Sequence, residues 1–146
     1  MLYTGVDLVE LARIEQAVGR WGERFLRRVY TANELNDCQG RVSSLAARWA
    51  AKEAAAKALG VGVQGFGAAD VVGAGIALRW TDLEVRRAEH GRPQLVLHGG
   101  AVQRAVTLHW HSVSLSLAHG RDYAVAFVVA QAAALDPSLA PIDPLA

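Results

Sequence analysis

The run LAARWAAKEAAAKALG (residues 45–60) constrains the fold more than any other part of this sequence. At about 100° per residue its larger side chains, Leu45, Trp49 and Leu59, fall on one stripe, while small alanines fill nearly all other directions. A helix that is apolar all round belongs in a protein interior. We therefore predict a long buried helix that ends at Gly60, because glycine commonly follows the last helical turn.

Shorter patterns predict the elements around this helix. Residues 2–9 favour a short central strand, and a helix is expected to follow it. The capping-box pattern from Thr31 to Glu34 predicts a second helix start, and Ser43 or Ser44 is the expected cap of the long helix. Downstream, the alternation of apolar and polar residues predicts one hairpin at 83–98 and a second at 112–129. A helix is expected between them, at 101–108.

These elements predict a single α+β domain in which the long helix packs on a mainly antiparallel sheet. The 146 residues suffice for one hydrophobic core, and the domain is expected to span residues 1–135. Residues 136–146 hold three of the four prolines and are predicted to form a flexible tail. The Gly- and Ala-rich residues 62–75 favour no particular element.

Charge and composition exclude several classes of protein. A net charge of +1 provides no general field for nucleic acid, so anion binding must come from local clusters of Arg and Lys. Cys38 is the only cysteine, which excludes an intrachain disulfide and favours a cytoplasmic location. Asp7 and Glu10 come too early for a signal peptide. The apolar stretch at 124–135 contains Gln131 and is too short to cross a bilayer, so no membrane association is expected.

Glu53 is the charged residue that is hardest to explain on a buried helix. An unpaired carboxylate in an interior costs several kcal/mol or becomes protonated, so Glu53 needs a cation nearby. Lys57, four residues on, is the ordinary partner, in a pair worth about 0.3–0.5 kcal/mol when exposed. However, the helix also carries Arg48 and Lys52, so three cations face one anion. A ligand with several negative charges would balance them.

The other candidate residues have adequate local explanations when taken alone. Asp7 with Glu10 three residues later suits a helix cap. Gly60 and Gly62 suit a helix stop, although their backbone amides could also approach a phosphate. His119 closes a strand beside a turn, which is weak evidence by itself. Hard oxygen ligands such as these carboxylates select Mg²⁺ or a similar ion.

Three segments, GVDLVELARIE, ARWAAKEAAAKALGVG and SLSLAHGRDYAVA, resemble the holo-acyl-carrier-protein synthase family of phosphopantetheinyl transferases. The resemblance runs from about residue 3 to residue 130 and implies that family's fold. It also implies transfer of phosphopantetheine from coenzyme A to a serine of apo-acyl carrier protein, with release of adenosine 3',5'-bisphosphate. Members are typically homotrimers with active sites between subunits, and they serve fatty acid biosynthesis and lipid metabolism.

The resemblance also implies roles for individual residues. Asp7 and Glu53 correspond to the Mg²⁺ ligands, and Glu53 and Lys57 to the catalytic pair. The base that takes the serine proton is either Glu53 or a metal-bound water. Arg13 and Arg20 fall where the family receives the acidic carrier protein. The residues that correspond to the coenzyme A site are Arg48, Lys52, Lys57, Gly60, Gly62 and His119.

Two other readings of the same residues remain. The first is a non-catalytic oligomer that binds coenzyme A or a nucleotide; the set of Asp7, Glu53 and Lys57 argues against it, because a binder gains little from a metal site. The second is an interaction protein that binds acidic partners through the basic residues of 13–28. The segment at 61–80 is longer than the family resemblance leads us to expect.

Overall fold

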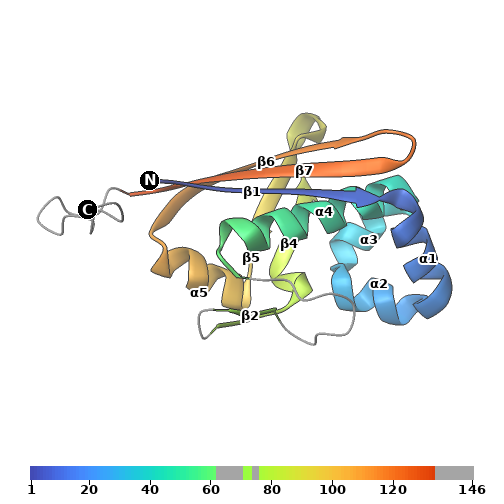
Figure 1. Ribbon diagram of the computed structural model, residues 1–146, viewed down its shortest axis with the longest axis horizontal. Helices are drawn as coiled ribbons and strands as arrows, with labels where there is room; N and C mark the ends of the chain where they lie inside the picture. The colour runs from blue at the N-terminus through green and yellow to red at the C-terminus, as the bar shows by residue number, and fades with distance from the viewer. Residues whose placement is uncertain (62–70, 74–75, 134–146) are drawn as a thin grey trace, which may run out of the picture.

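The computed structural model describes residues 1–61, 71–73 and 76–133, and Figure 1 shows their arrangement. In this part of the chain three long antiparallel strands form a sheet in the order β1 (Leu2–Glu10), β7 (Tyr123–Ala132), β6 (Trp110–His119). The long helix α4 (Val42–Ala58) lies against one face of that sheet. The predicted α+β architecture, with a buried helix on an antiparallel sheet, is confirmed.

Strand β1 lies at an edge of this described sheet, so the predicted central position was wrong. Its residues alternate in burial: Gly5 and Val9 are buried toward α4, whereas Val6 and Leu8 are exposed. Such alternation is typical of a sheet with one covered face. Apolar side chains on both faces suggested a central strand, but here the second apolar face is uncovered.

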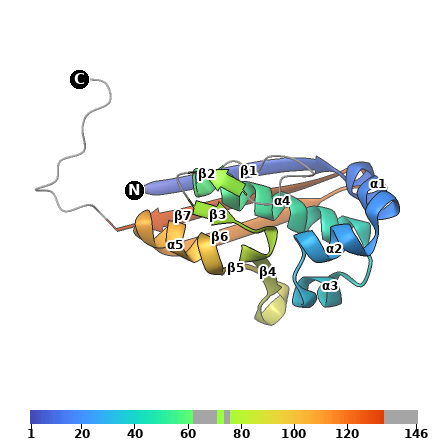
Figure 2. The same cartoon turned by 90° about the horizontal axis from the view of Figure 1, so that it is seen from below.

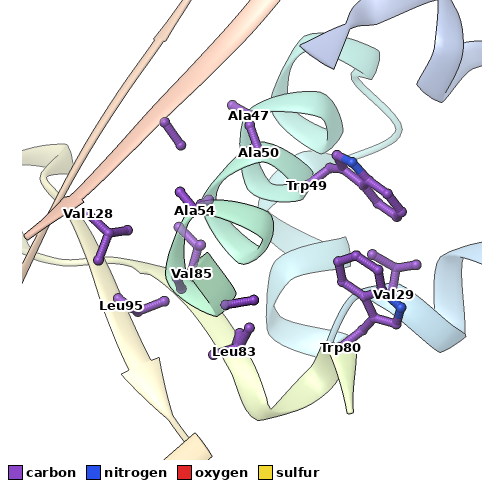
Figure 3. Packing of buried hydrophobic residues seen from close by; sticks show 14 of the residues in the cluster. Val29, Ala47, Trp49, Ala50, Ala54, Trp80, Leu83, Val85, Leu95 and Val128 are labelled. Carbon is purple, nitrogen blue, oxygen red and sulfur yellow. The ribbon is translucent and has the colours of Figure 1, made fainter. Parts of the chain in front are cut away.

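The core forms where α4 packs against the sheet on one side and against the helices of residues 11–38 on the other (Figure 3). Ala54 lies close to Val128 of β7, and Trp49 stacks on Trp80 with ring centroids 4.4 Å apart. Close approach of β1 to α4 depends on Gly5, because an added Cβ there would overlap the backbone carbonyl of Ala54. The small residues of α4 therefore let a strand lie almost directly on the helix backbone.

Three shorter helices cover the end of α4: α1 (Leu11–Trp21), α2 (Glu23–Val29) and α3 (Ala32–Cys38). The capping box predicted for α3 is present, since Thr31 accepts from the Glu34 amide and Glu34 accepts from the Thr31 amide. The predicted serine cap of α4 was wrong. Arg41 is the cap residue, because the tight turn after α3 lets the helix start at Val42.

The remaining elements cover the other sides of α4, and one hairpin among them extends beside β6 (Figure 2). They are the hairpin β4 (Leu83–Arg87) and β5 (Pro93–Leu97), the pair β2 (Val71–Gly73) and β3 (Ile76–Leu78), two 3-10 turns (Trp80–Asp82 and Glu89–Gly91), and α5 (Gly99–Thr107). Both predicted hairpins and the helix at 101–108 are confirmed. The predicted tail at 136–146 lies outside the described residues. None of the described helices combines the length and the apolar character needed to cross a membrane.

Candidate active site

Asp7 lies on the face of β1 that is turned toward α4. It follows Gly5 by two residues, so the close contact of that glycine with the helix also brings the Asp7 carboxylate to α4. The Lys57 ammonium lies 3.0 Å from Asp7 Oδ1 and donates to the Val6 carbonyl at 2.9 Å. Asp7 is thus not a helix cap, since Glu10 occupies the cap position of α1.

Glu53 lies beside this pair, and its environment disfavours a second negative charge. Burial and the charge of Asp7 raise the pKa of Glu53 from its ordinary value of 4.5 to about 7. The positive charges of Lys57 and Arg13 act in the opposite direction but do not cancel this effect. The structure therefore brings together Asp7, Glu53, Lys57 and Arg13 from three elements, β1, α4 and α1.

The carboxylates Asp7 and Glu53 fit a divalent cation. Two carboxylates that raise each other's energy are stabilised when a cation lies between them. Among the described residues no group of three or more His, Cys, Asp or Glu side chains converges, so this part of the chain would supply two carboxylate ligands. This matches Mg²⁺, which typically takes one or two carboxylates and completes its shell with water and substrate phosphates.

A second candidate site is a hollow of about 220 Å³ whose lining includes Arg48, Arg86 and Arg87. Arg48 is only 6% exposed, and its Nε has no hydrogen-bond partner within the described residues. Its contact with Asp37 is long, at 3.4 Å. A buried guanidinium with an unused donor, beside two more arginines, indicates a site for an anion.

Arg86 and Arg87 did not stand out in the sequence. They belong to the β4–β5 hairpin, far along the chain from Arg48, and only the packing of that hairpin beside α4 brings the three together. Two consecutive arginines at the end of a strand were the available signal. That signal alone does not distinguish a ligand site from an ordinary solvated strand end.

Lys52 is the predicted phosphate ligand that the structure contradicts. Its side chain is completely buried, and its ammonium donates to Glu34 at 2.8 Å and to the carbonyls of Trp80 and Leu83 at 3.0 and 2.5 Å. An ammonium has three donors, so none remains for a phosphate. The sequence placed Lys52 near the large apolar stripe of the helix, where its buried acidic partner could not be identified.

The other predicted residues occupy the rim of the site or the surface beyond it. His119 ends β6, and strand alternation places it on the same face as Leu117, which lines the arginine hollow. Gly60 follows α4 with a φ of 68°, as expected of a glycine stop, whereas Gly62 lies outside the described residues. Arg20 is exposed at the end of α1, with its guanidinium 4.9 Å from the centroid of the Trp21 ring.

Comparison with known proteins identifies the family to which this arrangement belongs. A family model described as the 4'-phosphopantetheinyl transferase superfamily matches residues 3–128. The holo-[acyl-carrier-protein] synthase of Herpetosiphon aurantiacus is 54% identical over 132 residues, covering 88% of this chain and 98% of the relative. The synthase of Chloroflexus aggregans is 53% identical over 137 residues, covering 89% and 95%.

Solved structures agree with this result. The crystal structure of Helicobacter pylori holo-[acyl-carrier-protein] synthase in complex with coenzyme A has a TM-score of 0.72 and 30% identity, covering 88% of this chain and 99% of that one. A coenzyme A complex from Chronobacterium ammoniagenes has a TM-score of 0.75 and 28% identity, covering 92% and 99%. By its matching family model, its relatives and its fold, the chain belongs to the 4'-phosphopantetheinyl transferase superfamily.

Proposed function

We propose that this chain transfers the phosphopantetheine group from coenzyme A to a serine of apo-acyl carrier protein, releasing adenosine 3',5'-bisphosphate. The observation that carries the proposal is the Asp7–Glu53 pair held beside Lys57, in a chain more than 50% identical to proteins named holo-[acyl-carrier-protein] synthase. Neighbouring structures that contain coenzyme A support the same substrate. A protein that only binds coenzyme A or a nucleotide would not need the carboxylate pair.

In this proposal Asp7 and Glu53 hold Mg²⁺. When bound, the ion neutralises the charge that develops on the pyrophosphate of coenzyme A. Lys57 orients Asp7 through its hydrogen bond, and two of its donors are used by Asp7 and Val6, which leaves a third for a phosphate oxygen. The serine proton passes either to Glu53 or to a water molecule at the metal site.

The arginine hollow supplies the remaining charge for coenzyme A. Arg48, Arg86 and Arg87 offer donors to a phosphate group, and guanidinium groups bind phosphate through paired hydrogen bonds. His119 and the glycines Gly60 and Gly62 are proposed to border the same ligand. Lys52 is not included, since its donors are used inside the protein.

The outer face of the sheet supports a homotrimer. Leu2, Val6 and Leu8 of β1 are exposed beside Phe127 of β7, so the face of the sheet opposite α4 carries an apolar patch over these two strands. An exposed apolar patch of this kind is typical of a subunit interface. We propose that copies of the chain cover it, with sites between neighbours, and that the enzyme works in the cytoplasm in fatty acid biosynthesis.

A mass-shift assay tests the proposed reaction. Apo-carrier protein, coenzyme A, Mg²⁺ and this protein are combined, and the carrier should gain the mass of one phosphopantetheine group. Chelation of the metal should abolish the gain, and Glu53→Gln should reduce it by a factor on the order of 10²–10³ in a folded protein. Glu89→Gln, which changes an exposed carboxylate in the β4–β5 turn, is the matched control. An unchanged mass with several carrier proteins would refute the proposal.

A further inference from the structure

Glu84 is a buried carboxylate that no step of the proposed reaction uses. It lies in β4 and is 2% exposed. The next three residues of the strand, 85–87, line the arginine hollow, whereas Glu84 does not. A buried charge costs free energy unless its oxygens are paired, so the partners of Glu84 indicate what this carboxylate does.

The two oxygens of Glu84 bind different parts of the protein. Oε1 accepts from the Thr31 hydroxyl at 2.8 Å and from the Asn33 side-chain amide at 3.1 Å, and both partners lie at the start of α3. Oε2 accepts from Arg86 Nε at 2.9 Å and lies 2.8 Å from Nε2 of His98. One oxygen therefore fixes the carboxylate to α3, and the other holds a guanidinium group.

The strand that carries Glu84 is also held from the interior. The Val85 amide donates to Glu34 Oε1 at 2.9 Å, and Glu34 is the buried partner of Lys52. Glu84 and Arg86 are two residues apart, so strand alternation places them on the same face of β4. A carboxylate that is fixed in this way can define the position of the Arg86 head group.

Arg86 is held through only one edge of its guanidinium group. Nε is bonded to Glu84, and within the described residues the two terminal nitrogens have no partner. These two nitrogens form the fork that can bind two oxygens of a phosphate. Because the Arg86 side chain is 47% exposed, a ligand can reach the fork.

We propose that Glu84 is a positioning residue, which holds Arg86 by Nε so that the two terminal nitrogens bind a phosphate of coenzyme A in the arginine hollow. This inference rests on the proposed function, because it takes coenzyme A as the ligand. A free arginine side chain loses rotamer freedom when it binds a ligand. The contact with Glu84 restricts the side chain before the ligand arrives and so reduces that loss. Glu84 itself does not touch the substrate.

Steady-state kinetics with a matched control test this role. Glu84→Gln keeps the size of the side chain but removes the charge that holds Arg86, so the KM for coenzyme A should rise about tenfold. Both kcat and the KM for carrier protein should stay within about twofold, because a group that binds ground state and transition state alike changes KM and not kcat. Asn33→Ala removes a hydrogen bond to Oε1 and none to Oε2, so it should change none of the three values. An unchanged KM for coenzyme A in Glu84→Gln would overturn the proposal.

A double-mutant cycle separates positioning from general support of the fold. Arg86→Gln alone should raise the KM for coenzyme A about tenfold, and adding Glu84→Gln to it should raise the KM no further. Added to Arg87→Gln, Glu84→Gln should still have its full effect. Because Arg86 is half-exposed, Arg86→Gln is expected to fold even if Glu84→Gln does not. A wild-type KM for coenzyme A in Arg86→Gln, or additive effects of Glu84→Gln and Arg86→Gln, would overturn the proposal.

Binding of the reaction product tests the contact without turnover. Adenosine 3',5'-bisphosphate is titrated into each protein in a calorimeter, and circular dichroism checks that each protein is folded. Glu84→Gln and Arg86→Gln should each weaken binding about tenfold, and Asn33→Ala should bind like wild type. Equal binding by wild type and Glu84→Gln would overturn the proposal. A wild-type protein that binds the bisphosphate but modifies no carrier would instead refute the proposed function.

Discussion

Lys52 and Glu53 are neighbours in the sequence, yet α4 directs them into two charged clusters of opposite character. The interior cluster joins Lys52 to Glu34, and both side chains are completely buried. The outer cluster joins Glu53 to Asp7 and Lys57, and the Lys57 side chain is 53% exposed. Successive helical residues differ by about 100° in direction, which is enough to separate them.

The clusters differ most in how completely their polar atoms are satisfied. Glu34 accepts from Lys52 and from the amides of Thr31 and Val85, at 2.8, 2.9 and 2.9 Å. Lys52 in turn uses all of its donors. In the outer cluster, by contrast, two carboxylates lie near each other and one of them has a raised pKa. A saturated cluster stabilises a fold, whereas two carboxylates held close together are a candidate site for a cation.

The largest expected effect comes from breaking the interior cluster. Lys52→Met should lower the free energy of unfolding by about 3–5 kcal/mol, because Glu34 would remain buried without its cation. Urea denaturation followed by circular dichroism measures this change. The double variant Lys52→Met/Glu34→Leu should recover part of the loss, since no buried charge is then left unpaired. A single variant as stable as wild type would contradict the comparison.

Acid should lower the free energy of unfolding through Glu84, which borders the interior cluster of Lys52 and Glu34. Burial alone would raise the pKa of Glu84, but hydrogen bonds from His98, Thr31 and Asn33 outweigh it and lower the pKa from 4.5 to about 2. Glu84 thus stabilises the fold above pH 4.5, and this contribution is lost as the pH falls toward 2. We expect a loss of about 2–3 kcal/mol, measured by urea unfolding at several pH values. Glu84→Gln should remove this part of the pH dependence.

The outer cluster should respond to pH in the opposite direction. The pKa of Glu53 is raised to about 7. Protonated Glu53 therefore contributes fully to the free energy of unfolding below pH 4.5, and this contribution is lost as the pH rises through 7. Without metal, wild type should therefore lose about 1–2 kcal/mol relative to Glu53→Gln over this range. Added Mg²⁺ should restore the loss in wild type and leave Glu53→Gln unchanged. Restoration in both proteins would remove Glu53 from the metal site.

The smallest stability effect is expected for Lys57→Met. Because the Lys57–Asp7 pair is half-exposed, its loss should change the free energy of unfolding by less than about 1 kcal/mol. The same substitution should strongly reduce phosphopantetheine transfer. Lysines at positions 52 and 57 would thus separate stability from activity, with chemical denaturation and the mass-shift assay as the two measurements. A large loss of stability in Lys57→Met would contradict the prediction that only the interior cluster contributes strongly to the stability of the fold.

Much of the fold could be predicted because its signals are local. The buried helix followed from alanines on nearly every side, and the start of α3 followed from the Thr31–Glu34 capping box. The edge position of β1 could not be predicted, since Val6 and Leu8 are apolar on the outward face. Apolar residues on a covered face and apolar residues on an exposed face look the same in a sequence.

The sequence indicated the neighbours of a charge where that charge needed a cation, but it could not indicate partners that came from distant segments. Glu53 required a cation, and the structure brings Lys57 and Arg13 near it. Lys57, however, pairs with Asp7 across 50 residues and not with Glu53 one turn away. Lys52 had no visible partner in the sequence, because Glu34 reaches it only through the packing of α3 against α4.

The sequence by itself determined that a helix with alanines all round must be buried, and that its charged residues must meet partners or a ligand there. It also carried the motifs by which the family is identified. Only the tertiary structure decided which charge meets which partner, and so placed Lys52 with Glu34 in the interior and Lys57 with Asp7 near the surface. The physical reason is that a helix specifies only the direction of each side chain. The packing of β1, α3 and the β4–β5 hairpin specifies what lies in that direction.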